Sequence, residues 1–227
     1  MRRLLYVPII HGEADLGSAG PELAKKSISL SGESRWAFHL EVVSRFWKNV
    51  RSLLISLDPA RLKLYQDGLA VGGETGQKIV EEAAGSGSKN YRLVEEMILM
   101  GAEPRKTEDP VLILRERENL QRSMQKGSAG TGGARTAQYQ QQRDQLMEER
   151  DAFIAETIAN TLIEGELGVL FIGAHHDVLS RLTDHISVKA VVDPETVQAY
   201  FQELVFGDND GRLDELSRCL TSTFKAP

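Results

Sequence analysis

Short apolar runs alternate along this chain with longer segments of helical periodicity, and this alternation limits the possible folds more than any other feature. The runs are bounded by turn residues and have the length of buried strands, at 4–10, 62–66, 102–107, 169–172 and 186–192. Helices that join parallel strands must cross over on the faces of the sheet. We therefore expect an α/β fold, with a mostly parallel central sheet of about five strands flanked by helices, in a single domain spanning residues 1–227.

The segments between these runs repeat apolar residues every three or four positions, which is typical of helices that pack one face against a sheet. Helices are expected at 36–57, 75–84, 89–100, 110–124, 138–164 and 178–182, and two more after Pro194. The stretch KGSAGTGGA, residues 126–134, is rich in glycine and small polar residues, so we expect a flexible loop between two helices there.

Composition excludes several classes of protein. The formal charge is -6 and no dense cluster of Lys and Arg is present, which argues against a nucleic-acid-binding protein. Cys219 is the single cysteine, so neither an intramolecular disulfide nor a thiolate metal cage can form, and a reducing cytoplasm fits best. No apolar run reaches the roughly 18 residues that cross a bilayer. We expect a cytoplasmic protein that binds neither nucleic acid nor a membrane.

Polar residues follow each of the first four expected strands. In parallel sheets, ligands bind beyond the C-terminal ends of the strands, so these residues should converge on one site. They are His11, Glu13 and Asp15 after the first strand, Asp67 after the second, Glu108 and Asp109 after the third, and His175 and His176 after the fourth.

An imidazole with nearby carboxylates suits a divalent metal ion or general acid-base chemistry. Each residue also has a simpler interpretation, because Asp67 precedes Gly68 in a turn, Asp109 can cap a helix, and the polar loop after His11 can cap the next helix. The adjacent His175 and His176 should point in different directions, so we expect one of them to be functional and the other to support the fold through a bond to a backbone carbonyl.

Two further residues are candidates for ligand contact. Gly173 would let the backbone approach a ligand closely. Arg150 could hold a carboxylate or phosphate with two parallel hydrogen bonds, although a surface ion pair within its helix is the alternative. The sequence contains no G-x-S-x-G elbow, no complete phosphate-binding loop and no H-E-x-x-H helix.

One longer segment resembles a known superfamily. ERDAFIAETIANTLIEGELGVLFIGAHH, residues 149–176, is similar to the segment shared by the TraB, Tiki, ChaN and erythromycin-esterase-like proteins, where an Arg-Asp or Arg-Asn helix leads into a strand ending in G-x-x-H. Gly173 and His176 match that motif, so the resemblance implies that His176 is the functional histidine and His175 the supporting one. PIIH, residues 8–11, corresponds to a histidine motif after the first strand, with Pro8 in place of glycine.

The resemblance implies an α/β fold whose site is built from both histidine motifs and nearby carboxylates. Members differ in activity: Tiki proteins resemble metal-dependent proteases, erythromycin esterases open a lactone with histidine as the base, and ChaN binds haem.

We therefore expect a metal-dependent hydrolase, in which a divalent metal ion activates water against an ester or amide bond of a small-molecule or peptide substrate. The alternative is a non-enzymatic binding or regulatory protein that holds a small ligand such as haem in the same pocket. The expected roles are metal ligation by His11, His176 and Asp67, general-base catalysis by Glu13 or Glu108, anion binding by Arg150 and backbone contact with the cofactor at Gly173.

Overall fold

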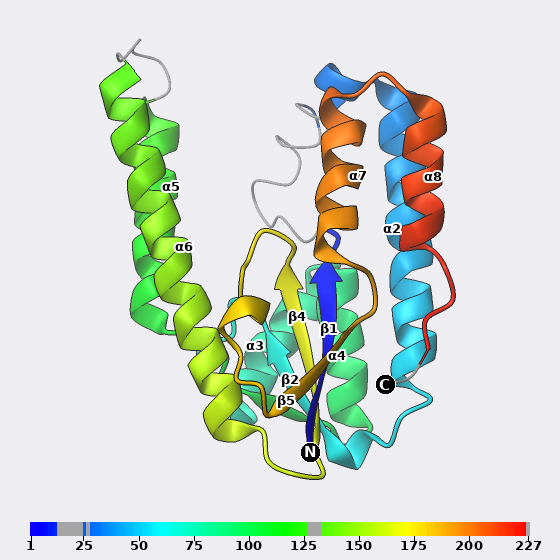
Figure 1. Cartoon of the computed structure of the whole chain (residues 1–227), viewed down its shortest axis with the longest axis vertical. Coiled ribbons are helices and arrows are strands. Elements are labelled where there is room, and N and C mark those ends of the chain that lie inside the picture. The colour runs from blue at the N-terminus through cyan, green and yellow to red at the C-terminus, as the bar shows by residue number, and fades with distance from the viewer. Residues whose placement is uncertain (13–24, 26–27, 127–132, 226–227) are drawn as a thin grey trace.

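A single parallel sheet forms the centre of the molecule, in agreement with the expected α/β class (Figure 1). The computed structural model describes residues 1–12, 25, 28–126 and 133–225, with the backbone alone for 120–126 and 133–138. In this part of the chain, five strands lie in the order β3-β2-β4-β1-β5. Their bounds are β1 Arg2–Ile9, β2 Leu62–Gln66, β3 Glu103–Arg105, β4 Leu167–Gly173 and β5 Ile186–Ala190.

The helices also follow the expected pattern. Those described are α2 Glu33–Leu54, α3 Gly73–Gly85, α4 Lys89–Leu99, α5 Pro110–Lys126, α6 Gly133–Thr161, α7 Pro194–Phe206 and α8 Asp210–Leu220. Two 3-10 turns complete the set, η2 Pro59–Arg61 and η3 Leu179–Arg181, the second of which lies where a short helix was expected. The glycine-rich stretch expected as a flexible loop lies mostly outside the described residues, between the end of α5 and the start of α6.

Local sequence explains several helix starts. The Ser88 side chain accepts a hydrogen bond from the Tyr91 backbone N–H at the start of α4. Asp193 caps α7 in the same way, and Pro194 occupies the first helical position, where its missing N–H costs nothing. No helix in the described part of the chain is long and apolar enough to cross a membrane.

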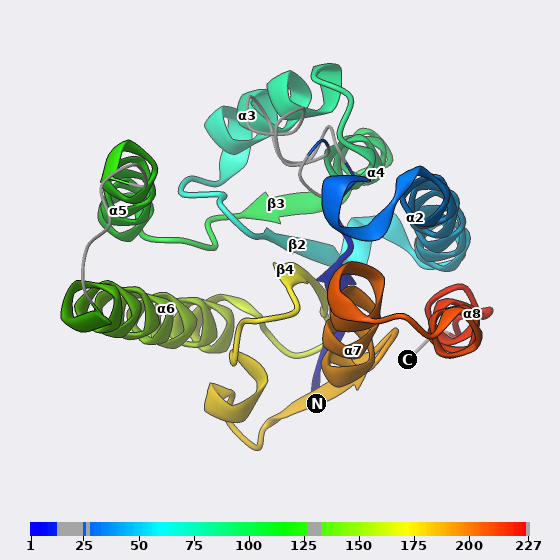
Figure 2. The ribbon, with the colours of Figure 1, turned by 90° about the horizontal axis from the view of Figure 1, so that it is seen from above.

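The sheet buries apolar side chains on both faces. One face, with Leu5, Val7 and Phe171, packs against α2, α3, α4, α7 and α8. The other face, with Tyr6 and Leu170, packs against α6 (Figure 2). Because strands covered on both faces alternate their side chains between two cores, the near-continuous apolar runs in the sequence are what such a sheet requires.

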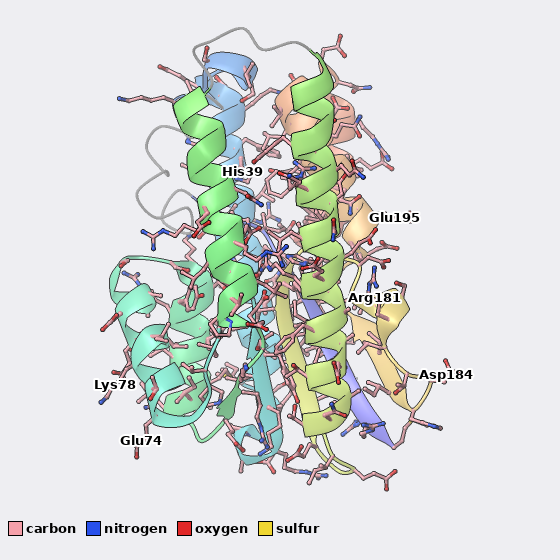
Figure 3. The ribbon with its side chains drawn as sticks, turned by 90° about the vertical axis from the view of Figure 1, so that its left-hand side faces the viewer. His39, Glu74, Lys78, Arg181, Asp184 and Glu195 are labelled. Atoms are coloured by element: carbon pink, nitrogen blue, oxygen red, sulfur yellow. The ribbon has the colours of Figure 1, made fainter. Side chains whose placement is uncertain are left out.

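Strand pairing brings the ends of β1, β2 and β4 together. Ile9 of β1 is in register with Gly173 of β4, and Gln66 of β2 is in register with Phe171 of the same strand. The loops that follow these strands therefore emerge at one edge of the sheet. Helices α5 and α6 form a hairpin that rises beyond this edge, opposite α7 (Figures 1 and 3).

Candidate functional site

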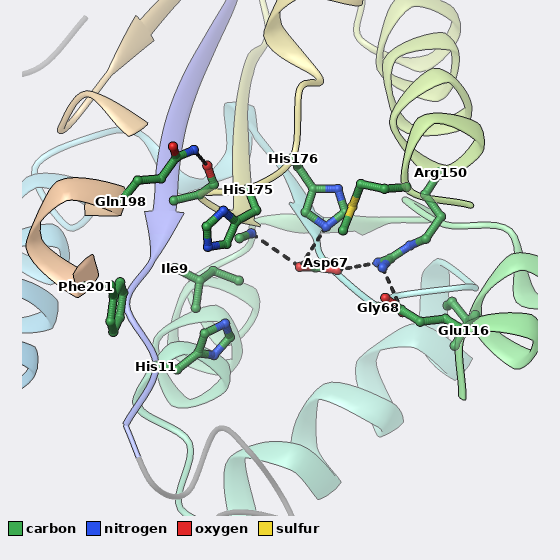
Figure 4. Close-up of a pocket in the computed structure, with 14 residues that line it drawn as sticks. Ile9, His11, Asp67, Gly68, Glu116, Arg150, His175, His176, Gln198 and Phe201 are labelled. Carbon is green, nitrogen blue, oxygen red and sulfur yellow. Dashed lines mark hydrogen bonds and ion pairs between the residues drawn. The ribbon is translucent and has the colours of Figure 1, made fainter. Parts of the chain in front are cut away.

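A cavity of about 570 Å³ lies over the C-terminal edge of the sheet, between the α5–α6 hairpin and α7 (Figure 4). Residues from all these elements line it: Ile9, His11, Asp67, Gly68, Ile113, Glu116, Met147, Arg150, Gly173, Ala174, His175, His176, Gln198 and Phe201. The edge predicted from the sequence is therefore the edge at which this cavity opens.

His176 is held from behind by a carboxylate of α6. Its Nδ1 lies 2.5 Å from Asp151 Oδ1, and the other oxygen of Asp151 accepts a hydrogen bond of 2.8 Å from the Asp177 backbone N–H. The side chains of His176 and Asp151 are only 6% and 3% exposed. Burial would lower the pKa of His176, but the bond to Asp151 and the negative charges of Asp67 and Asp151 raise it above its ordinary value. The contact with Asp151 therefore fixes the orientation of the His176 ring and favours its protonated form.

Arg150, next to Asp151 on α6, is surrounded by carboxylates. Its guanidinium donates to Glu108 at 2.5 and 3.2 Å, to Asp67 Oδ1 at 2.8 Å and to Glu116 at 2.8 Å. Burial raises the pKa of Glu108 in spite of Arg150. Burial acts in the same sense on Asp67, but the positive charges of His176 and Arg150 hold its pKa below the ordinary value. Asp67 therefore remains an anion between these two residues.

Asp67 joins the arginine cluster to the histidine. Its Oδ2 lies 3.7 Å from His176 Nε2 and accepts a hydrogen bond of 3.3 Å from the Gly173 backbone N–H. Figure 4 shows the carboxylate between Arg150 and His176. Asp67 is thus more than the turn residue before Gly68 that a simple reading of the sequence allows.

The structure brings most of the predicted site residues to the cavity. His11, Asp67, Arg150, Gly173 and His176 all line it. Glu108 does not, because its side chain is fully buried beneath the Arg150 guanidinium. Glu13 and Asp15 lie outside the described residues.

His175 is placed differently from our expectation. It is exposed and lines the cavity, and within the described residues no hydrogen bond to its ring is found. A backbone carbonyl of this turn is bound by another side chain instead: the Gln198 amide donates to the Ala174 carbonyl at 2.5 Å. The turn is therefore held from α7 without the His175 ring.

A second buried histidine supports the cavity from α2. His39 Nδ1 lies 3.1 Å from the Tyr200 hydroxyl, and its Nε2 lies 3.2 Å from the backbone carbonyl of His11. Burial lowers the pKa of His39 to about 4. A neutral imidazole thus links α2 and α7 to the loop that carries His11.

Sequence reasoning assigned no site role to Asp151, Glu116, Gln198 or Phe201. A site role for Asp151 could have been predicted, since it is the second residue of the Arg-Asp pair in the 149–176 segment. The other three come from α5 and α7, and no local pattern marks them as close to the ends of distant strands.

The predicted metal ligands form only part of a site. Within the described residues, no group of three or more His, Cys, Asp and Glu side chains has an arrangement that could hold a metal ion. Asp67 and His176 are a close pair, but Arg150 already binds Asp67. These residues by themselves therefore do not form the expected three-ligand site. Metal ligation by His11, His176 and Asp67 stays a prediction.

Comparisons with known proteins give no independent assignment: no family model, no curated protein and no solved structure matches this chain.

Proposed function

We propose that this protein is a hydrolase that cleaves an ester or amide bond of a small-molecule or peptide substrate, with His176 as the general base. The observation that carries the proposal is the His176 ring on the cavity wall, with Asp151 bound to its Nδ1 from behind. A carboxylate bound to one imidazole nitrogen fixes the tautomer and leaves the other nitrogen to accept a proton.

Water is the expected nucleophile. The cavity lining in the described residues includes no Ser, Thr, Cys or Lys side chain. The 3.7 Å between His176 Nε2 and Asp67 Oδ2 is too long for a direct hydrogen bond, but both atoms can contact one water molecule. The same pair could therefore orient a water molecule and remove its proton.

The reaction proceeds in two steps. The water oxygen attacks the substrate carbonyl carbon while one of its protons passes to His176 Nε2, and the Asp151 carboxylate stabilises the resulting imidazolium. The tetrahedral intermediate then expels the alcohol or amine, which takes the proton from His176. The raised pKa of His176 matches this role, because a higher pKa strengthens the imidazole as a base.

A panel of p-nitrophenyl esters with acyl chains of increasing length, together with p-nitroanilides, tests this function. We expect His176→Ala to lower kcat/KM by about 10²–10⁴-fold, the usual range for a general base. His185→Ala is the matched control, because this exposed histidine lies in the loop before β5 and does not line the cavity. A His176→Ala variant with rates within threefold of the parent would refute the assignment.

The pH profile adds a second test. Because only the neutral imidazole accepts a proton, kcat/KM should fall as pH decreases through the His176 pKa, which lies above the ordinary value of 6.5. Asp151→Asn removes one of the two negative charges that raise this pKa, so the inflection should move to lower pH and the rate should fall. An inflection that stays in place would show that His176 does not control the profile.

A metal-assisted form of the reaction is the second candidate, in which His176 and Asp67 would hold a divalent ion together with ligands from outside the described residues, and the ion would supply the activation of water. Elemental analysis of untagged protein and calorimetric titration with Zn²⁺ or Mn²⁺ test it without turnover. Stoichiometric binding that is lost in both His176→Ala and Asp67→Asn would support it, and no binding would reject it. A coloured protein with a Soret band would support the ligand-binding alternative instead.

A further inference from the structure

Hydrolysis requires a hydrogen-bond donor for the substrate's carbonyl oxygen, because the attack of water gives this oxygen a negative charge. Most donors on the cavity wall are already engaged. Arg150 makes four hydrogen bonds to carboxylates, the Gly173 N–H donates to Asp67, and the Gln198 amide donates to Ala174. The wall that holds the general base therefore has little capacity left for an oxyanion.

His175 lies where such a donor is needed. The turn after β4 is closed by a hydrogen bond of 3.1 Å from the His176 N–H to the Gly173 carbonyl, and within this turn the two histidine rings diverge. His176 turns toward Asp151 on α6, whereas His175 remains exposed on the cavity side. Its ring is the side-chain donor next to the general base for which the described residues provide no partner.

Strand register supports this placement. Ile9 and Gly173 are paired across β1 and β4, and His11 and His175 each lie two residues further along their chains. Both line the cavity, and Figure 4 shows both on the side away from Arg150, with Ile9 between them in this view. A substrate carbonyl attacked from the His176 side would therefore present its oxygen toward His175.

We propose that His175 is a catalytic residue that donates a hydrogen bond to the carbonyl oxygen of the substrate and stabilises the oxyanion of the tetrahedral intermediate. The inference rests on the proposed hydrolase function. It divides the work of two adjacent side chains: His176 exchanges a proton with water and the leaving group, and His175 binds the oxygen that becomes charged. No covalent bond to His175 forms or breaks.

Three variants test the proposal with the p-nitrophenyl ester on which the parent protein is most active. His175→Ala should lower kcat by about 10²–10³-fold, as expected for loss of one oxyanion donor, with a small change in KM. His175→Gln keeps a side-chain N–H and should recover at least tenfold of that loss. His185→Ala should match the parent. The melting temperature should not change in any of them, since the His175 ring is exposed.

A measurement without turnover separates this inference from the function on which it rests. A trifluoromethyl ketone with the same acyl chain forms a hydrate that resembles the tetrahedral intermediate, and its Kd should rise at least tenfold in His175→Ala. A parent protein that hydrolyses the ester while both kcat and Kd stay within threefold in His175→Ala overturns the inference alone. A parent protein that neither hydrolyses the panel nor binds the ketone overturns both.

Discussion

The two walls of the cavity differ in how firmly their side chains are held. The charged wall, defined as Asp67, Arg150, Asp151 and His176, is a continuous set of hydrogen bonds and ion pairs rooted in α6. The open wall, defined as His11, His175 and Phe201, comes from the ends of β1 and β4 and from α7. Groups that must hold one geometry during a reaction gain from such bonding, whereas groups that bind varied substrates do not need it.

Charge separates the walls as well. Among the described residues that line the cavity, Arg150 is the single permanent cation, and Asp67, Glu108 and Glu116 already bind it. A carboxylate or phosphate on a ligand would have to displace one of these partners. These carboxylates therefore compete with any anionic ligand for Arg150, the residue expected to bind an anion. Uncharged or cationic ligands suit the cavity better.

The largest effect should come from breaking the charged wall at its centre. Arg150→Met leaves Glu108 buried without its partner, so the free energy of unfolding should fall by about 3–5 kcal/mol in urea denaturation. Glu108→Gln added to that variant removes the stranded charge and should restore part of the loss.

Arg115→Met is the control for the same chemical change. Arg115 pairs with Glu149 at 2.6 Å, but the two side chains are 51% and 34% exposed, so the loss should be at most about 1 kcal/mol. Equal losses in the two variants would mean that the charged wall is no more rigid than the surface.

The sequence predicted the sheet and the edge at which the cavity opens because both follow from local patterns. Apolar runs of strand length fixed the order of elements, and the rule for parallel sheets then placed His11, Asp67 and His176 together. The inward position of Glu108 could not be predicted in this way. The backbone N–H groups of Thr107 and Glu108 both donate to the Leu69 carbonyl, at 2.8 and 3.1 Å, and this contact between two loops draws Glu108 under Arg150.

The roles of the two adjacent histidines show the same limit. Sequence spacing selected His176 through the G-x-x-H match, but it gave no means of orienting His175. That orientation depends on the turn from Gly173 to His176, on Asp151 of α6 and on Gln198 of α7, which are far apart in the sequence. Such contacts arise from tertiary packing and leave no periodic signal.

Lowering the pH should destabilise the folded protein through protonation of His39, which binds the backbone carbonyl of His11 on the open wall. Because the pKa of His39 falls from 6.5 to about 4 on folding, the unfolded chain binds a proton at higher pH than the folded protein does. The free energy of unfolding should therefore decrease as pH falls through this interval, by roughly 3 kcal/mol in total.

Carboxylates titrate in the same interval, so the parent must be compared with His39→Gln, which cannot gain the proton. The unfolding free energy of the variant minus that of the parent should therefore increase from pH 6.5 to pH 4, whatever its value at neutral pH. A difference that is independent of pH would show that folding does not lower the pKa of His39.

The smallest change in stability is expected at the point where the two walls meet, in Gly173→Ala. Gly173 has no positive φ, and a Cβ there would lie 3.6 Å from His176 Cδ2 and 3.7 Å from Asp67 Oδ2, which are ordinary contact distances. The free energy of unfolding should therefore change by no more than about 0.5 kcal/mol. The added methyl nevertheless lies beside the two groups proposed to share a water molecule, so kcat should fall roughly tenfold. Gly85→Ala, at the end of α3 with open space around its Cβ, should leave kcat unchanged and should raise the free energy of unfolding by no more than about 1 kcal/mol. If Gly173→Ala loses stability but keeps kcat, the glycine serves the packing of the turn, and the proposal that Asp67 and His176 share a reacting water molecule is wrong.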